Sequence, residues 1–325
     1  MAVTTVQTGV TGASDFDLAL KAYAGEVLAE FENTNILLGL TRSKTMKPGA
    51  KSVQFPALGA IGTKYHTAGD DVLRDAGYLQ SVNQGEREIF ADRECLSPIF
   101  LDSVEERISH WGDRQEYAQK QGHGLAKKAD QMVMRVLGLA AADAGGGNYT
   151  GSPSGYTDTS AAADPTAAEV LAFLLDLQEE MDNKEVPEED RHALVTPKIM
   201  RLMATSTEMQ PYIDHDFEQA NGSLARTKVM RIADFKIHKI THMPTDNYTD
   251  TDNKLAAGVG NSYVFNATKL KIICFQREAM GTARAADLSL ETEYQMAMRG
   301  DLLLAAMQMG HGVLRPECAG TLFGL

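Results

Sequence analysis

Two stretches of alternating polar and apolar residues lie in the first hundred positions of the chain. Lys51 to Phe55 alternates before Pro56 and Gly59 end the run, and Glu86 to Ile99 alternates in part. Side chains on one face of a strand recur at every second position, so each run is typical of a half-buried strand. The glycine-rich, polar segment between the runs predicts a long β-hairpin. Because that segment holds few large apolar residues, we expect the hairpin to need cover from outside its own chain.

The longest helix is predicted to follow this hairpin. Ser103 and Glu106 have the spacing of a capping box, in which two side chains satisfy free N–H groups at a helix start. Apolar and small residues then recur at steps of three and four to about Ala141, which predicts a helix of about 57 Å. Gly122 and Gly124 each cost roughly 1 kcal/mol relative to alanine, so we expect bends there. Gaps in the stripe favour a single helix over a coiled coil. The stripe comprises Val104, Ile108, Trp111, Gln115, Ala118, Gly122, Leu125, Ala129, Met132 and Val136.

From about residue 166 to residue 280 the pattern is that of a mixed α+β region. Thr166 and Glu169 form another capping box before a helix to Asp182. We expect its apolar side to contain Val170, Leu171, Leu174, Leu175, Gln178 and Met181. Strands are predicted at His192–Thr196, Phe235–Ile240, Ser262–Phe265 and Leu270–Phe275, with a helix from Pro197 to about Ser206. Later strand patterns lie at Leu288–Glu291 and Asp301–Gly310, and a weaker helical pattern lies at Leu18–Leu38.

Two segments have the composition of flexible chain. Residues 1 to about 15 are small and polar, which predicts an arm without regular structure. Ala144 to Pro165 is rich in glycine, serine and threonine, and we expect a linker or surface loop. Gly145-Gly146-Gly147 lacks the Lys-Ser/Thr pair and the preceding strand of a phosphate-binding loop, so this function is excluded.

The chain carries 44 acidic and 31 basic residues, a formal net charge of −13 at pH 7. Proteins that grip nucleic acid normally show a basic patch, because phosphate contacts dominate their affinity. Lys127-Lys128 comes nearest to one, and we interpret it as part of a solvated helix face. No apolar run approaches the ~20 residues of a membrane helix, so no membrane partner is expected. The N-terminal residues lack the basic and apolar regions of a secretory signal.

Candidate catalytic and metal-binding residues are weak throughout. His215 lies between Asp214 and Asp216, but adjacent side chains diverge and no further ligand completes a metal site. Gly151 to Gly155 resembles the serine-nucleophile motif only superficially, because it lies in the loop-like segment. The three cysteines Cys95, Cys274 and Cys318 are odd in number and widely spaced, which indicates buried thiols in a reducing compartment. We therefore expect no catalytic residue, no cofactor and no metal.

The C-terminal stretch MGHGVLRPECAGTLFGL, from Met309 to Leu325, has a strand-like pattern bent at Arg315-Pro316-Glu317, with the Arg and Glu expected to be exposed at a turn. It resembles the C-terminal end of the major capsid protein of short-tailed phages of the podovirus, autographivirus type. YAGEVLAEF from Tyr23 and GAKSVQFPALG from Gly49 resemble that family in the same order. Residues 102–140 and 186–197 also fit, so the similarity covers most of the chain. Ile232-Ala233-Asp234-Phe235 departs from the family, which tends to have a Gly-Phe turn there.

This resemblance implies the Hong Kong 97-type capsid fold, an α+β fold with an N-terminal arm, an extended β-hairpin loop, a peripheral domain with a long spine helix, and an axial domain. The implied boundaries are 1–42 for the arm, 43–87 for the extended loop, 88–143 with 280–325 for the peripheral domain, and 144–279 for the axial domain. The axial domain is thus inserted in the peripheral one.

The resemblance also implies a function. We expect a bacteriophage structural protein that self-assembles, as hexamers and pentamers, into the icosahedral head shell enclosing the phage genome. Implied partners are a scaffolding protein and a portal, with double-stranded DNA enclosed without specific binding; an acidic wall would not adhere to it. The implied location is the virion, after assembly in the host cytoplasm.

Subunit contacts are expected at six residues. Four lie in the extended loop, and two could form a salt link near the C-terminus; they are Val53, Phe55, Leu58, Tyr65, Arg315 and Glu317. Two alternatives remain open from the sequence. One is an encapsulin-like homomeric compartment with the same fold, and the other is a cytoplasmic enzyme with an α+β active site of unfamiliar kind.

Overall fold

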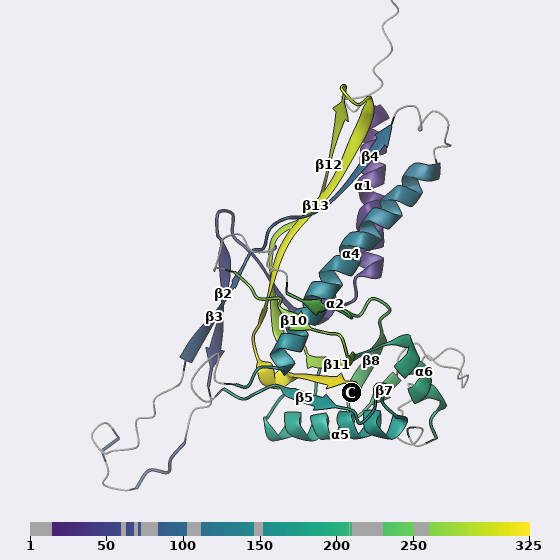
Figure 1. Cartoon of the computed structure of the whole chain (residues 1–325). Helices are drawn as coiled ribbons and strands as arrows, with labels where there is room; N and C mark the ends of the chain where they lie inside the picture. Colours follow the sequence, from purple (N-terminus) through teal and green to yellow (C-terminus); the bar gives the residue numbers. More distant parts are fainter. Residues whose placement is uncertain are drawn as a thin grey trace, which may run out of the picture. The chain divides into compact units, whose positions relative to one another are not determined.

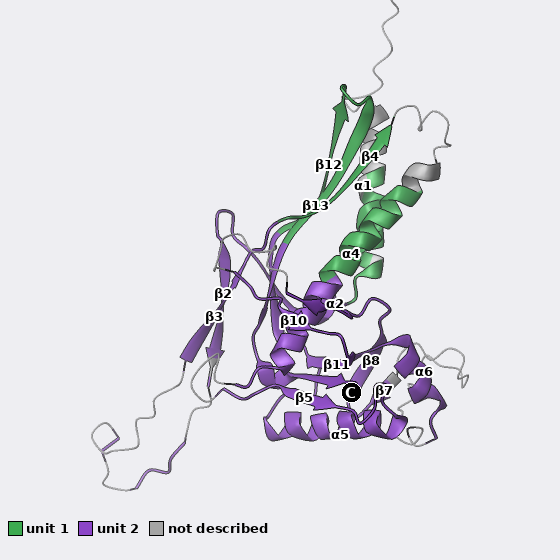
Figure 2. Ribbon diagram, viewed as in Figure 1, with its two compact units in different colours: residues 1–36, 94–129, 286–308 green, residues 37–93, 130–285, 309–325 purple. Residues whose placement is uncertain are grey.

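A computed structural model of the chain describes residues 15–59, 63–67, 71–72, 84–102, 112–145, 152–207, 209, 230–249 and 260–325. The chain divides into two compact units (Figure 2). Unit 1 comprises residues 1–36, 94–129 and 286–308, and unit 2 comprises residues 37–93, 130–285 and 309–325. Helix α4 (Gly112–Ala141) and strands β12 (Met280–Gln295) and β13 (Gly300–Val313) contribute residues to both units (Figure 1).

Unit 1 packs two helices on one face of a sheet. The helices are α1 (Asp15–Thr34) and the first part of α4, and the strands are β4 (Cys95–Asp102) with parts of β12 and β13. Strand β13 lies between the other two and pairs antiparallel with β4, from Gly300 opposite Asp102 to Met307 opposite Cys95. A small apolar core joins helices and strands; it contains Tyr23, Val27, Ala118 and Leu303, with Leu101, Leu288 and Leu290 packed against it.

Helices α1 and α4 approach each other closely at Gly122. A Cβ atom on Gly122 would lie 2.6 Å from the carbonyl oxygen of Val27, which is closer than real contacts allow. Next to this point Tyr23 Oη donates to Gln121 Oε1 at 2.9 Å, and Gln121 Nε2 donates to the carbonyl oxygen of Ser97 in β4. The glycine and glutamine that interrupt the apolar stripe therefore hold α1, α4 and β4 together. Helix α4 runs unbroken from Gly112 to Ala141, and the predicted bends stay a prediction.

Unit 2 is built on a six-stranded sheet in the order β5-β14-β11-β6-β8-β7. The strands are β5 (Tyr156–Thr159), β14 (Ala319–Phe323), β11 (Leu270–Gln276), β6 (Arg191–Val195), β8 (Phe235–Lys239) and β7 (Met230–Ile232). β14 is parallel to β5 and antiparallel to β11, so a strand from the last residues of the chain lies inside the sheet. Helix α6 (Pro197–Thr205) follows β6 directly, and the short pair β9 (Asn247–Tyr248) and β10 (Phe265–Asn266) is separate. The predicted strands at Phe235 and Leu270 and the helix beginning at Pro197 are confirmed.

Helix α5 (Ala167–Asn183) packs against this sheet. Its predicted capping box is confirmed: Thr166 N donates to Glu169 Oε2 at 2.7 Å, and Glu169 N donates to Thr166 Oγ1 at 3.3 Å. A Cβ atom on Gly320 of β14 would lie 2.6 Å from Leu177 Cδ1, so the helix and this strand are in close contact. The predicted apolar side was partly wrong, because the sheet lies nearer Phe173 and Leu177. The buried residues are Val170, Phe173, Leu174, Leu177 and Met181, whereas Leu175 is exposed.

The turn between β7 and β8 is the segment Ile232–Phe235, which departs from the Gly-Phe turn that the family tends to have. Ala233 and Asp234 both have positive φ, 49° and 64°, as two-residue hairpin turns of the favoured hand require. Asp234 is held on both sides, by Gln178 Nε2 at 2.7 Å and by Arg231 Nη2 at 3.0 Å. Side-chain hydrogen bonds thus stabilise a turn that lacks glycine.

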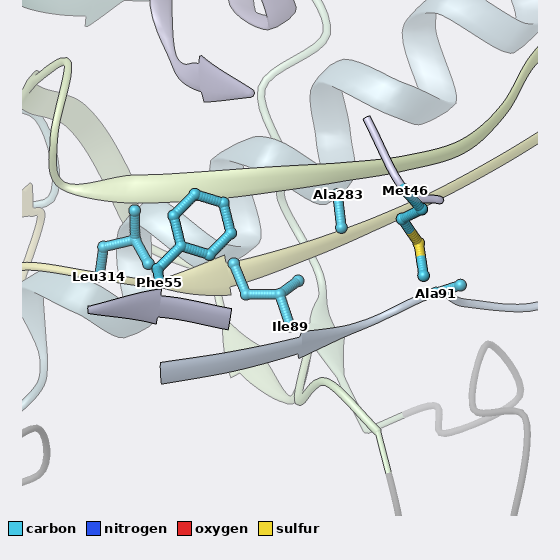
Figure 3. Close-up of a cluster of buried hydrophobic side chains, with 6 residues drawn as sticks. All are labelled: Met46, Phe55, Ile89, Ala91, Ala283 and Leu314. Carbon is cyan, nitrogen blue, oxygen red and sulfur yellow. The ribbon is translucent and has the colours of Figure 1, made fainter. Parts of the chain in front are cut away.

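The predicted β-hairpin is present in unit 2. Strands β2 (Ser52–Leu58) and β3 (Gln84–Phe90) pair antiparallel, from Ser52 opposite Phe90 to Leu58 opposite Gln84. The expectation that its apolar residues need cover from another chain is wrong at its base. There, six side chains close a buried cluster, formed by Met46, Phe55, Ile89, Ala91, Ala283 and Leu314 (Figure 3). β1 (Arg42–Thr45), preceded by the short helix α2 (Leu37–Leu40), runs parallel to the start of β12 beside this cluster.

A buried polar cluster explains why the alternating run from Glu86 breaks into two strands. Asp92 accepts hydrogen bonds from Tyr263 Oη and, at 3.1 Å, from Asn261 Nδ2. Tyr263 Oη in turn accepts from the backbone N–H of His311 at 2.8 Å, and the Thr282 hydroxyl lies 3.0 Å from His311 Nδ1. Burial and the neighbouring Asp92 carboxylate raise the pKa of Tyr263 well above its usual value. The chain leaves β3 to bury Asp92 and resumes at β4.

Three further predictions need correction or fall outside the described residues. The segment from Ala144 to Pro165 is not only loop, because β5 lies in it; a polar strand at a sheet edge has no apolar alternation to reveal it. Strand β10 begins only at Phe265. The capping box predicted at Ser103 and Glu106 lies outside the described residues, and the residue before it, Asp102, ends β4. Among the helices of the described chain, none is long and apolar enough to cross a membrane.

Candidate assembly surfaces

The described residues contain no cluster suited to metal binding. No group of three or more His, Cys, Asp or Glu side chains gathers there. The three cysteines are free; burial raises the pKa of Cys318 to about 12, and burial also raises the pKa of Cys274. Such thiols stay protonated and are poor nucleophiles and ligands. His215 and its neighbouring aspartates lie outside the described residues.

The residues predicted for the extended loop have very different surroundings. Phe55 is 1% exposed and belongs to the buried cluster of its own chain, with Val53 packed partly buried against it. Tyr65 is 97% exposed, so its ring contacts almost nothing in this chain. The side chain of Leu58 lies outside the described residues. Tyr65 is therefore the member of this group whose ring is open to a partner.

The structure brings Arg315 and Glu317 together. Arg315 Nε lies 2.7 Å from Glu317 Oε1, and its Nη1 lies 3.1 Å from Glu278 Oε2. Arg315 directly precedes the 3-10 turn η3 (Pro316–Cys318), which contains Glu317 and leads into β14. The prediction of a salt link is confirmed, but the prediction that Glu317 is exposed is wrong, because only 5% of its side chain is accessible. The buried carboxylate keeps the guanidinium beside its own turn.

Strands β4 and β13 of unit 1 carry exposed apolar side chains that the sequence analysis did not single out. Leu96 and Phe100 are 51% and 39% exposed. Their cross-strand partners are Ala306 and Leu302, and Pro98 pairs with Leu304 between them. We call the exposed and half-buried residues of this set the apolar sheet face: Leu96, Pro98, Phe100, Leu302 and Leu304; Ala306 is buried beside them. Leu101 and Leu303 belong to the core on the opposite face, so this strand pair is apolar on both sides.

A signal for this face was present in the sequence. Leu302-Leu303-Leu304-Ala305-Ala306 is a continuous apolar run, and such runs are typical of strands covered on both faces. The segment between β12 and β13 adds to the exposed apolar surface, since Met296 and Met298 are 83% and 58% exposed. Exposed apolar side chains gathered on one unit are typical of protein–protein interaction sites.

Comparison with known proteins shows the family of this chain. The family model of the Gp10A-like major capsid protein matches residues 54–323. The chain belongs to this family. The major capsid protein of Enterobacteria phage T3 is 26% identical over 340 residues, which covers 97% of this chain and 93% of the relative. The major capsid protein of Escherichia phage T7 is 26% identical over 345 residues, covering 96% and 94%.

The fold comparison agrees. The capsid structure of the cyanophage P-SCSP1u superposes with a TM-score of 0.73 at 26% identity, covering 99% of this chain and 93% of the other. This chain is a major capsid protein of a phage head shell, with the Hong Kong 97-type α+β fold, and such proteins assemble into multimeric icosahedral shells in the virion. The predicted family, fold and function are confirmed. The family is one of structural capsid proteins.

Proposed function

We propose that copies of this chain assemble as hexamers and pentamers that close into the head shell around double-stranded DNA. A scaffolding protein and a portal are the proposed partners, assembly takes place in the host cytoplasm, and the chain carries no catalytic or cofactor site. The observation that carries the proposal is the exposed apolar surface of unit 1 in a protein of the capsid family. Closed symmetry lets every copy cover the same surface on its neighbours.

The proposed domain organisation is an arm at 1–42, an extended loop at 43–87, a peripheral domain at 88–143 with 280–325, and an axial domain at 144–279. Five of the six strands of the unit 2 sheet lie within 144–279. The exception is β14, which pairs with β5 and β11 and so joins the C-terminal residues to that sheet.

The apolar sheet face is the part of the surface that we expect to contribute most to subunit contacts. Burying apolar area stabilises association by roughly 25 cal/mol per Å², and specific interfaces bury on the order of 800 Å² per partner. Tyr65 and the Arg315–Glu317 link are proposed as further contact positions, with Val53, Phe55 and Leu58 supporting the loop that carries Tyr65.

Electron microscopy of the recombinant chain tests this function directly. With and without a scaffolding partner, we expect closed shells or rings of five and six subunits. Monodisperse monomers under both conditions would contradict the proposal. As a variant, Leu96→Ser with Phe100→Ser should raise the protein concentration needed for assembly by about tenfold or more, since each copy loses apolar contact area. Leu175→Ser with Val264→Ser changes two exposed apolar residues of unit 2 and is the matched control.

A further inference from the structure

The part of α4 in unit 1 carries a group of lysines on its exposed side. Lys120, Lys127 and Lys128 are exposed, and we call them the lysine face. At 100° and 1.5 Å per residue, Lys120 and Lys127 lie about 20° apart around the helix and about 10 Å apart along it. The opposite side of the same turns is buried, at Ala118, Leu125 and Ala129. Lys120 and Lys127 therefore point away from the unit's own core, and Lys128 lies at the edge of the exposed side, near enough to Cys95 of β4 to influence the pKa of that thiol.

Among the described residues these lysines have no ion-pair partner, as is also true of Lys47, Lys51 and Lys239. No described carboxylate forms an ion pair with any of the three. In contrast, Lys184 lies 3.0 Å from Glu180, and Asp164 pairs with two further lysines, Lys198 at 2.6 Å and Lys271 at 3.1 Å.

The acidic groups nearest to the lysine face are few. Glu116 is exposed on the same helix, about one turn before Lys120. On α1, Glu30 lies beside Gly122 and accepts a hydrogen bond from Thr34 Oγ1 at 3.2 Å. His123 lies next to the same threonine, 3.4 Å from its hydroxyl, and adds no fixed positive charge at neutral pH. In a chain of net charge −13, the three lysines form a locally positive surface.

The chemistry of this surface fits a polyanion better than a protein. Cores of protein interfaces are enriched in aromatic and apolar residues and depleted of lysine. The lysine face has Gly124 between its charges, and Tyr117 is the one exposed aromatic residue beside it among those described. Duplex DNA presents a negative charge about every 1.7 Å along its axis, so all three amino groups can reach phosphates without a fixed register.

We propose that the lysine face contacts the phosphate backbone of the DNA that the shell encloses, with about three phosphates per subunit and no sequence preference. This inference rests on the proposed function in one respect, namely that DNA fills the shell. It identifies the side of unit 1 that faces the genome. It also reconciles an acidic chain with a wall that contacts DNA, because the contact is confined to one helix face.

DNA binding by the unassembled full-length chain tests the proposal. The probes are two 30-base-pair duplexes of unrelated sequence, and the readout is fluorescence anisotropy between about 25 and 200 mM salt. We expect equal affinity for both duplexes and a slope of log K against log salt near −2.7, from about −0.9 per contacted phosphate. The variant Lys120→Gln, Lys127→Gln, Lys128→Gln should lose at least tenfold in affinity at low salt, with a slope close to zero.

The matched control is Lys47→Gln, Lys51→Gln, Lys239→Gln, which makes the same change in net charge at three exposed positions elsewhere. It should bind DNA within about twofold of the unchanged chain. Equal losses in both variants, or no loss in the first, would overturn the proposal. If the first variant keeps DNA binding but no longer binds a scaffolding protein, the face belongs to an acidic protein instead. Shell formation by electron microscopy, measured in parallel, reports on the proposed function independently.

Discussion

Gly122 and Gly124 lie two residues apart on α4 in opposite surroundings. A methyl group on Gly122 would collide with backbone atoms of Val27 and Phe31, at 2.6 and 3.3 Å, whereas nothing lies within 4 Å of the same position on Gly124. Backbone in a packed helix cannot yield as a flexible side chain does. Gly122 is therefore required by packing against α1, whereas Gly124 affects only the helix propensity of α4.

We predict that Gly122→Ala lowers the free energy of unfolding by about 1–3 kcal/mol, the usual cost of overpacking. Gly124→Ala should raise it by up to about 1 kcal/mol, because alanine is the better helix former. Denaturant unfolding of the unassembled subunit measures both. Equal stabilisation by the two substitutions would show that α1 and α4 are not in close contact at Gly122.

For a single residue, the sequence shows its local properties but not which distant residues pack against it. The glycines of α4 were recognised as weak points of a helix, which is a local property. The contact that makes one of them necessary comes from Val27, about a hundred positions earlier. Glu317 is similar: its charge predicted a salt link with Arg315, but its burial depends on how the whole C-terminal segment packs.

Among elements, the hairpin of β2 and β3 combines a base packed within its own chain with an exposed aromatic residue beyond it. The base is fixed by seven cross-strand pairs and by the cluster around Phe55 and Ile89. Tyr65 contributes to neither. Stability of the subunit and contact with other copies are thus carried by different parts of one element.

Deletion of Lys64 to Gly77 should consequently leave the subunit folded and abolish shell assembly. The melting temperature is expected to change by only a few degrees, since the paired residues and the buried cluster remain. Circular dichroism with thermal melting and electron microscopy give the two readouts. Normal shells from the shortened chain would refute a bracing role for the loop, and Tyr65→Ser provides a point substitution with the same expected direction.

Element prediction succeeded where the signal is local. The capping box at Thr166 and the strand–proline–helix sequence around Pro197 were correct because each depends on a few adjacent residues. Strand β5 was missed because its sequence, Tyr-Thr-Asp-Thr, is polar, and its pairing with β14 is decided by residues far away in the chain. The buried side of α5 shifted for the same reason, since the sheet selects which residues it covers.

For the molecule as a whole, buried histidine makes stability depend on pH. His311 is 4% exposed, and burial, with a smaller contribution from Arg284, lowers its pKa from 6.5 to about 4. The folded state then binds fewer protons than the unfolded state below pH 6.5. The stabilising contribution is complete above pH 6.5 and is lost as the pH falls toward 4, at about 1.4 kcal/mol per pH unit for one group.

Urea unfolding of the unassembled subunit at several pH values between 7.5 and 5 measures this loss. We expect His311→Gln to flatten the pH dependence between 6.5 and 5 by about one proton, although the variant starts from a lower stability. His192, whose pKa is also lowered to about 4, titrates in both proteins and so cancels in the comparison. An unchanged slope would show that His311 is protonated in the folded state.

The whole fold could be assigned from the sequence through family resemblance, while the arrangement of surfaces could not. Alternating and helical patterns gave most elements, yet whether a given apolar face is covered depends on pairing over long distances. The base of the hairpin was expected to be open and is closed by Ala283 and Leu314, more than two hundred positions later. The reverse holds for the apolar sheet face on β4 and β13, whose apolar run is typical of covered strands but which is exposed within this chain.

The position of β14 has a consequence for synthesis in the infected cell. Strands β5 and β11 both pair with residues 319–323, so β5 has no strand partner in this sheet, and β11 has only β6, until the ribosome has passed that point. Most of the polypeptide is therefore translated before the sheet can close. A product released before residue 319 lacks an inner strand of this sheet, so we expect such a fragment to fold incompletely.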